Sequence, residues 1–455
     1  MGEYFTNRMK IIIFSLVLFS KFFPNYPLFE IKVNNNPYPS KIFVSTSTMD
    51  PDIQNHSFMT ILDENLDTYW QVNSYYNGRD FKKNNDRISY HKFIKNGFMT
   101  DDENTWENNH YFIFLGNDMV EIDTLKYDFG SEGFLDWHDV LVTENNGYLF
   151  YGNETHFLDL SSIGGTSNNE TRKVPRIIEF DEDKNIIFNW SALDHLNILS
   201  YSELNFGNTG RFNWTHINSV DFDFDGNILV SNRRGNEIIK INKQTGDVMW
   251  IFSGPRNQFN IIGDNFGGVS DQHDARRLAN GNILIFDNGN NHNPPTTRVV
   301  EYQIDEQNMT AELVWEFHNP YNLHAIATGS SQRLPNGNTL INWGTLEDSN
   351  GNVDYGASIM EVNPNNEVVL EIEYSNARVY KVRKDDWVFD IPMMKGDLNL
   401  DGIVDILDII NLVNYILSQN TSPNFPVLNL FKTDLNYDQL INITDIIELV
   451  IVITN

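Results

Sequence analysis

Histidines are scarce in this chain of 455 residues, and several of them stand at matching points of a repeated pattern. His138, His216 and His273 each lie shortly before a turn of the Asn-Gly or Asp-Gly type, and His324 lies near a fourth such turn. An imidazole can ligate a transition metal, serve as a general base, or form a covalent intermediate at nitrogen. All three chemistries are open from the histidines alone.

Guanidinium and amide groups accompany these histidines in the sequence. They are Asn218, Arg233, Arg234, Arg276 and Arg277. The whole chain has 32 Lys+Arg against 62 Asp+Glu, a formal net charge of −30, which leaves no general basic surface for nucleic acid. A local arginine cluster inside such a chain suits an anion with several oxygens, such as a sulfate or phosphate ester, because a guanidinium fork pairs two oxygens at once. The same arginines oppose a bound cation, which favours a base or a nucleophile over a metal ligand.

The histidines introduce repeated hairpins, which must position them. Turn glycines at Gly147, Gly226, Gly281 and Gly337 separate short apolar strands, and each hairpin precedes another whose last strand often ends in Trp. Four strands per unit over residues 28–390 predict an all-β, six-bladed propeller, with a two-sheet sandwich as the alternative. In a propeller, equivalent blade entries face one mouth of the central channel, so we expect the histidines to converge there.

Two acidic loops near the carboxy terminus have the ligand spacing of a calcium loop, and each opens a helix. The first supplies Asp397, Asn399, Asp401, Asp405 and Asp408, with the backbone carbonyl of Ile403. The second supplies Asp434, Asn436, Asp438, Asn442 and Asp445, with Leu440 at the carbonyl position. We expect two structural Ca²⁺ sites in residues 395–455 and no cofactor for catalysis. This region forms a small α-helical domain after the propeller.

The amino terminus carries an export pattern. Arg8 and Lys10 precede an apolar run over residues 11–20, which Lys21 ends. Such a run is too short to span a bilayer, which needs about 20 apolar residues. Residues 1–25 are therefore predicted to be a signal peptide or an amino-terminal anchor, and no other segment is expected to cross a membrane. The chain has no cysteine, which excludes disulfides, thiolate metal sites and a cysteine nucleophile.

The paired loop–helix pattern of residues 396–455 resembles the type I dockerin module. The resemblance implies calcium-dependent folding and a cohesin-type partner. In that family the partner contacts loop positions 10 and 11, which here are Ile406 with Leu407 and Ile443 with Thr444 rather than Ser/Thr pairs. It also implies a bacterial protein, exported to the periplasm, the cell surface or the medium.

The segments WHDVLV, WTHINSVDFDFDGNILVSNRR, GDVMWIFSGP and QHDARRLANGNILIFDNG resemble the bacterial arylsulfate sulfotransferases that do not use PAPS. The resemblance implies a ping-pong reaction in which a histidine takes a sulfuryl group from a phenolic sulfate ester and passes it to a second phenol. By motif, His273 matches the nucleophile, and His216 and Arg233 match the residues that hold the sulfuryl oxygens. His138 matches a proton donor or binder, and Asp274 or a backbone carbonyl is expected to orient His273. Further substrate contacts are assigned to Asn218, Arg234, Arg276, Arg277 and His324.

Two other functions are compatible with the same residues. One is a binding propeller without catalysis, displayed through its dockerin-like module. The other is a hydrolase of sulfate or phosphate esters that uses water as the acceptor. Turnover and its dependence on an acceptor phenol separate the three.

Overall fold

The structure is a computed structural model that describes most of the chain. The described residues are 29–48, 57–75, 78–93, 109–130, 133–198, 211–347, 356–374, 377–389, 395–398, 403–418, 433–436 and 441–454. The amino-terminal segment for which a signal or anchor is predicted lies outside them. Among the described residues no helix is long and apolar enough to cross a membrane.

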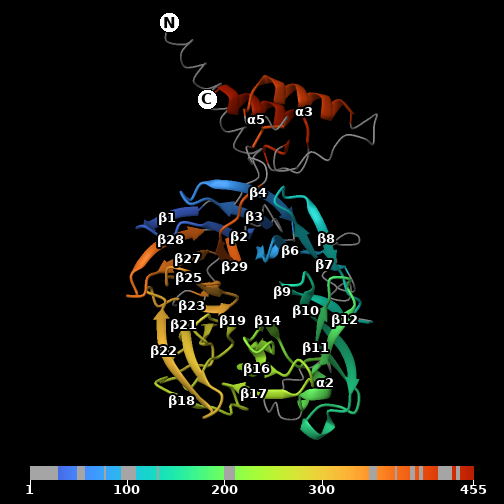
Figure 1. Ribbon diagram of the computed structural model, residues 1–455, viewed down its shortest axis with the longest axis vertical. Coiled ribbons are helices and arrows are strands. Elements are labelled where there is room, and N and C mark those ends of the chain that lie inside the picture. Colours follow the sequence, from blue (N-terminus) through green and yellow to red (C-terminus); the bar gives the residue numbers. More distant parts are fainter. Residues whose placement is uncertain are drawn as a thin grey trace, which may run out of the picture.

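Six mainly antiparallel sheets are arranged in a ring, which confirms the prediction of a six-bladed, all-β propeller (Figure 1). From the channel outward, blade 1 consists of β29 (Ala377–Asp385), β2 (Lys41–Thr48), β3 (Ser57–Leu62) and β4 (Thr68–Tyr75). Blade 2 consists of β5 (Arg79–Asn84), β6 (Arg87–Phe93), β7 (His110–Leu115) and β8 (Glu121–Leu125). Blade 3 consists of β9 (Phe134–Val142), β10 (Tyr148–Leu158), β11 (Asn169–Phe180) and β12 (Ile186–Ser191), and β13 (Arg211–Asn213) pairs with β11.

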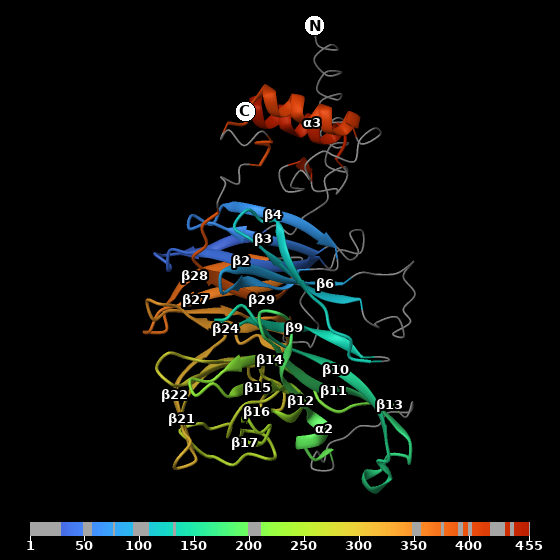
Figure 2. The ribbon, with the colours of Figure 1, turned by 45° about the vertical axis from the view of Figure 1, so that its right-hand side comes forward.

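The second half of the ring repeats the same order, and Figure 2 shows the strands of blade 4 in sequence from the centre outward. Blade 4 consists of β14 (Ile217–Phe222), β15 (Ile228–Asn232), β16 (Glu237–Ile241) and β17 (Val248–Phe252). Blade 5 consists of β19 (His273–Arg277), β20 (Ile283–Asp287), β21 (Arg298–Asp305), β22 (Thr310–His318) and the added β18 (Asn260–Ile262). Blade 6 consists of β24 (Ser330–Arg333), β25 (Thr339–Asn342), β27 (Ala357–Val362), β28 (Val368–Tyr374) and β1 (Phe29–Asn34).

Short elements connect the blades. They are η3 (Ser161–Ile163), α2 (Ala192–His195), η5 (Arg233–Gly235) and the paired strands β23 (His324–Ala327) and β26 (Thr345–Glu347). The ring closes twice, because the last strand β29 is the innermost strand of blade 1 and the first strand β1 is the outermost strand of blade 6. Each closure joins segments from opposite ends of the propeller sequence, so neither end of the sheet region leaves an isolated blade.

The predicted hairpin turns form where glycine permits a left-handed backbone. Gly226, Gly281 and Gly337 have φ angles of 79°, 91° and 88°. This conformation costs little only for a residue without a Cβ atom. The turns join β14 to β15, β19 to β20, and β24 to β25, and so fix the register of each inner strand with its neighbour.

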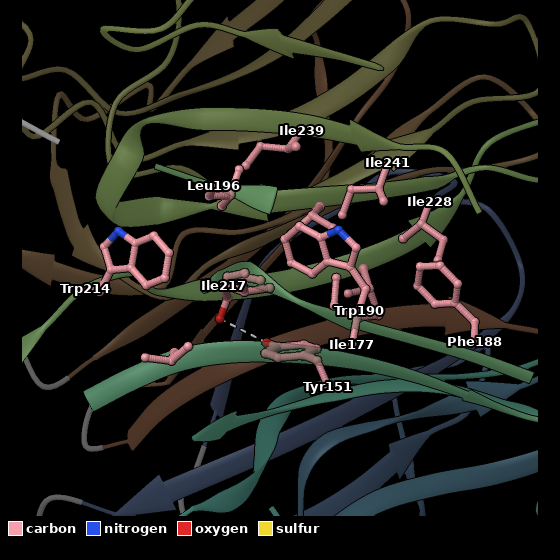
Figure 3. Packing of buried hydrophobic residues seen from close by; sticks show 14 of the residues in the cluster. Tyr151, Ile177, Phe188, Trp190, Leu196, Trp214, Ile217, Ile228, Ile239 and Ile241 are labelled. Carbon is pink, nitrogen blue, oxygen red and sulfur yellow. Dashed lines mark hydrogen bonds between the residues drawn. The ribbon is translucent and has the colours of Figure 1, made fainter. Parts of the chain in front are cut away.

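Aromatic side chains fill the wedge between neighbouring blades. Between blades 3 and 4, Trp190 and Trp214 are 1% and 0% exposed and pack among isoleucines (Figure 3). The indole N–H of Trp190 donates to the Gly246 carbonyl at 2.9 Å, and the Tyr151 hydroxyl donates to the Ile217 carbonyl at 3.0 Å. Burial of each such side chain contributes about 1.5–3 kcal/mol. Trp214 lies two residues before His216, so this packing anchors the segment that carries the histidine.

A circle of hydrogen bonds joins the innermost strands, and we call these bonds the inter-blade clasps. In ring order, the backbone amides of Val140, Val220, Ala275, Ser331 and Val382 donate to the side chains of Asp80, Asp139, Ser219, Asp274 and Ser330 at 3.1–3.2 Å. The Lys381 ammonium donates to Asp80 at 2.7 Å and closes the circle between blades 1 and 2. The clasps hold all six inner strands at a common height.

Ion pairs in the channel reinforce the clasps. Three buried carboxylates and four cations make up this channel ion network: Asp80, Asp139, Asp274, Lys82, Arg276, Lys381 and Arg383. Burial alone would raise the pKa of Asp274, but Arg383 and Arg276 hold that pKa far below its ordinary value. The network therefore stabilises the fold above the ordinary pKa of Asp, and its contribution is lost as the pH falls below that value.

The carboxy-terminal helices α3 (Ile406–Ser418) and α5 (Ile443–Thr454) lie side by side (Figure 1). Leu412 and Leu449 are fully buried and form a small core with Leu398 and Leu435. Leu398 and Leu435, one from each acidic loop, thus connect the two loops to the same apolar core. The predicted helix after each acidic loop is confirmed.

Replacement of Asp274 by Ala tests the channel ion network. Because Arg276 and Arg383 would then be buried without this partner, we expect Asp274→Ala to lower the free energy of unfolding by about 3–5 kcal/mol. Denaturant unfolding followed by fluorescence measures this change. The matched control Asp183→Ala removes an exposed turn carboxylate and should change stability by less than about 0.5 kcal/mol. Equal stability of the two variants would contradict the role of the network.

Candidate active site

The clasps also fix which side chains face one another across the channel. We call the residue whose side chain makes each clasp the clasp position. In each inner strand, the residue just before the clasp position occupies an equivalent place. These residues are Arg79, His138, Asn218, His273, Gly329 and Tyr380. We call this set the channel ring. It brings together two of the predicted catalytic histidines with Asn218, and it adds three residues that the sequence did not indicate, Arg79, Gly329 and Tyr380.

The histidines are close to one another, as the repeat pattern predicts. The Nε2 atoms of His138 and His216 are 3.2 Å apart, and the rings of His216 and His273 have centroids 6.5 Å apart. The ring of Tyr380 lies edge-on to His138 at 5.5 Å. Three imidazoles from blades 3, 4 and 5 therefore share one site.

Hydrogen bonds determine the tautomer of His273. The Asn288 side-chain NH₂ donates to the carbonyls of Ala325 and Thr328, so its Oδ1 must accept. His273 Nδ1 lies 2.7 Å from that oxygen and therefore carries the proton. The Nε2 atom of the neutral ring is then left with a free electron pair. Asn288, rather than Asp274 or a backbone carbonyl, orients the ring.

The surroundings of His273 keep it neutral. Burial and the positive charge of Arg233 lower the pKa of His273 to about 3. Burial and the neighbouring His138 likewise lower the pKa of His216 well below its usual range. At neutral pH both rings are uncharged. A neutral imidazole with a bare nitrogen is the form that attacks an electrophile.

His138 has a different environment. Its Nδ1 is hydrogen-bonded to the Asp136 carboxylate, which also accepts from the Asn153 amide at 2.6 Å. Although burial opposes it, the neighbouring His138 keeps the pKa of Asp136 below its ordinary value. The Asp136 carboxylate accepts the Nδ1–H of His138 and holds the ring so that its Nε2 faces His216. The His138–His216 pair can therefore store and return a proton.

The two neighbouring arginines have unlike positions. Arg233 is partly buried, pairs with Asp271 at 3.0 Å and donates to the Ile326 carbonyl at 3.2 Å. Its charge acts on His273 and His216. Arg234 is exposed overall. The protein around its guanidinium and the positive charge of Arg233 lower the pKa of Arg234. Of the two, Arg233 is the one directed toward the histidines.

The remaining predicted substrate contacts are distributed more widely. Asn218 is buried beside His273 and donates to the Gln272 carbonyl at 2.7 Å, while its Oδ1 finds no partner among the described residues. Arg276 belongs to the channel ion network, and Arg277 pairs with Asp223 at 2.7 Å near the turn end of blade 5. His324 contacts Asn290 at 3.0 Å instead of the three histidines. Only Asn218 of this group belongs to the channel ring.

Four residues of the site were missed from the sequence: Arg79, Asp136, Asn288 and Tyr380. Blade 2 has no Asn-Gly hairpin, so its inner strand was not recognised as a repeat. The signal that was available is the dipeptide Arg79-Asp80, which matches His138-Asp139 and His273-Asp274 in the inner strands of blades 3 and 5. Tyr380 lies on β29, the last strand of the propeller, which closes the ring as the innermost strand of blade 1. This strand is not part of the repeated hairpin pattern.

The acidic loops are only partly described. Asn399, Asp401, Asp438 and Leu440 lie outside the described residues. Asp408 and Asp445 are fully buried at matching positions, and each accepts two loop amides at 2.7–2.8 Å. Within the part that is described, no three acidic or histidine side chains converge as a metal site. Oxygen-rich loops around a buried carboxylate nevertheless have the donor set that suits Ca²⁺.

The pH dependence of catalysis tests the state of His273. Because its pKa is about 3, kcat/KM for a sulfate-ester donor should be maintained from pH 7 to pH 5, where an ordinary imidazole loses more than tenfold in neutral form. Arg233→Gln should move the acidic limb upward, toward pH 6.5. An acidic limb near pH 6.5 in the unmodified protein would contradict the assignment. The unfolded chain protonates this ring first, so stability falls as the pH drops from 6.5 toward 3.

One curated protein and several solved structures are similar to this chain. Arylsulfate sulfotransferase AssT of Escherichia coli O6:H1 is 25% identical over 166 residues, which cover 29% of this chain and 28% of that protein. The match therefore spans less than a third of AssT. Among solved structures, a protein of unknown function from Bacteroides caccae covers 76% of this chain and 99% of its own, with 9% identity and a TM-score of 0.45. The periplasmic gluconolactonase PpgL of Pseudomonas aeruginosa covers 76% and 99%, with 8% identity and a TM-score of 0.40.

Family comparison covers most of the chain. A family model described as Dockerin type I domain matches residues 395–451. A family model described as Arylsulfotransferase (ASST) matches residues 30–382, the whole propeller through most of its closing strand. The chain therefore belongs to the arylsulfotransferase family and carries a carboxy-terminal type I dockerin domain.

Proposed function

We propose that the protein transfers a sulfuryl group from a phenolic sulfate ester to an acceptor phenol through a covalent intermediate on His273. The observation that carries this proposal is the bare Nε2 of a neutral His273, held by Asn288 beside Arg233 and His216. Family membership supports the reaction class. The substrates are an aryl sulfate and a phenol, and no cofactor takes part in the transfer.

The proposed reaction has two balanced steps. His273 Nε2 attacks sulfur, the sulfur–oxygen bond to the aryl group breaks, and the phenolate leaves with a proton from the His138–His216 pair. The acceptor phenol then returns a proton to that pair, its oxygen attacks sulfur, and the nitrogen–sulfur bond breaks. Arg233, with the amide of Asn218, stabilises the sulfuryl oxygens in transit.

The dockerin domain places the enzyme outside the cell in this proposal. Two Ca²⁺ ions would be held by the two loops, with Asp408 and Asp445 as buried anchors. A cohesin-type module would be the partner. The exposed side chains at the family's contact positions are Ile406, Leu407 and Ile443, so the contact on this side is largely apolar. A signal or anchor in residues 1–25 would direct export in a bacterium.

A transfer assay tests the reaction. The purified chain with 4-nitrophenyl sulfate and a phenol acceptor, without PAPS, should release nitrophenol in proportion to acceptor. Removal of the nucleophile in His273→Ala should reduce the rate by at least about 10³-fold. His324→Ala, which alters a ring outside the channel ring, should retain activity within about threefold. Release without acceptor would indicate a hydrolase. A folded protein that releases none would indicate a binding propeller.

Calcium removal tests the dockerin loops. We expect a chelator to unfold α3 and α5 in the full-length chain, since the buried Asp408 and Asp445 then lack their cation, while the propeller remains folded. Helical circular dichroism and protease cleavage after residue 390 should both report the change, and added Ca²⁺ should reverse it. The transferase rate should be unaffected. Helices that resist the chelator would show that the loops need no metal.

A further inference from the structure

Arg79 holds the place in blade 2 that His138 and His273 hold in blades 3 and 5. The clasp position that follows it, Asp80, corresponds to Asp139 and Asp274. Its side chain is exposed to solvent, although it starts an innermost strand of the channel. A guanidinium at this level of the ring therefore faces the same space as the reactive histidines.

The guanidinium of Arg79 lies on an aromatic platform. Its carbon is 5.1 Å from the centre of the Trp137 ring, and Trp137 stacks on His138 at 5.3 Å and on Phe134 at 5.6 Å. This cation–π contact holds the guanidinium against the indole ring. Arg79 is thus preorganised next to one member of the catalytic pair.

Arg79 is distinguished from the other channel arginines by its lack of a carboxylate partner. Arg233, Arg276 and Arg383 pair with Asp271, Asp139 and Asp274 respectively. Among the residues that the structure describes, Arg79 makes no ion pair. Arg79 is accessible to solvent at the channel. An accessible guanidinium without a carboxylate partner can bind an anion from solution.

Arg79 and Arg233 act on different histidines of the site. The charge of Arg79 acts on His91 and His110, whereas that of Arg233 acts on His216 and His273. Trp137 stacks on His138, so a substrate ring that extended from His273 past His138 would reach Trp137 and Arg79.

We propose that Arg79, stacked on Trp137, binds a carboxylate carried on the aromatic ring of the substrate. The inference rests on the proposed function and narrows its substrates to acidic phenols and their sulfate esters. A planar carboxylate fits the guanidinium edge with two parallel hydrogen bonds, and the indole supports the adjoining ring. Neutral phenols bind the same site without this contact.

Equilibrium binding tests the proposal without turnover. By calorimetry, 4-hydroxyphenylacetate should bind about 10- to 100-fold more tightly than the neutral isostere 4-hydroxyphenylacetamide. Arg79→Gln should abolish this preference and leave the amide affinity unchanged. The matched control Arg333→Gln, in which the guanidinium stacks on Trp315 at 4.8 Å in another part of the ring, should keep the preference. Thermal unfolding confirms that each variant is folded.

Two results would overturn the proposal: no preference for the acid in the unmodified protein, or a preference that survives Arg79→Gln. An equal loss for acid and amide would also overturn it, because Arg79 would then act on a part common to both. In the transfer assay, Arg79→Gln should raise KM for the acidic acceptor by a larger factor than KM for a neutral acceptor. Binding preference without any turnover would reject the proposed function and retain the carboxylate site.

Discussion

The clasps between innermost strands are the constraint on which the rest of the structure depends. Each one uses a short side chain of one blade to accept a backbone amide of the next, and Lys381 completes the circle at Asp80. Because every clasp fixes the height of its strand, the preceding residue of each strand reaches the same level of the channel. A site assembled from widely separated residues therefore needs no flexible loop to bring them together.

The same arrangement separates two kinds of polar group. At the clasp positions and beyond them along the inner strands, carboxylates and cations pair in a nearly closed ion network. At the level of the channel ring, His273 remains neutral because burial and Arg233 disfavour a second positive charge there. The carboxylate of Asp136 instead binds Nδ1 of His138. One imidazole is thus prepared for attack, and another for proton transfer, by neighbours of opposite charge.

Much of this was predictable from local patterns. Turn glycines such as Gly226 and Gly281 and the recurring histidines gave the propeller and the meeting of His138, His216 and His273. The hydrogen-bond partners of His273 and His138 were not predictable. Asn288 follows the strand that pairs with the strand of His273, and Asp136 lies near a register shift between β9 and β10. Contacts between blades decide whether an arginine is available to substrate or is paired with a carboxylate. The sequence alone therefore could not show that Arg276 pairs with Asp139 whereas Arg233 acts on His273. The contribution of Arg79 required the register of a blade without a recognisable hairpin.

The central claim is that His273 Nε2 is the atom that receives the sulfuryl group. The most direct measurement is mass spectrometry of the protein after brief reaction with an aryl sulfate in the absence of any acceptor. The account predicts a single added SO₃ group, mapped to the peptide that contains His273 and removed on addition of a phenol. An unmodified protein that still turns over, or an adduct mapped to His138 or His216, would contradict it.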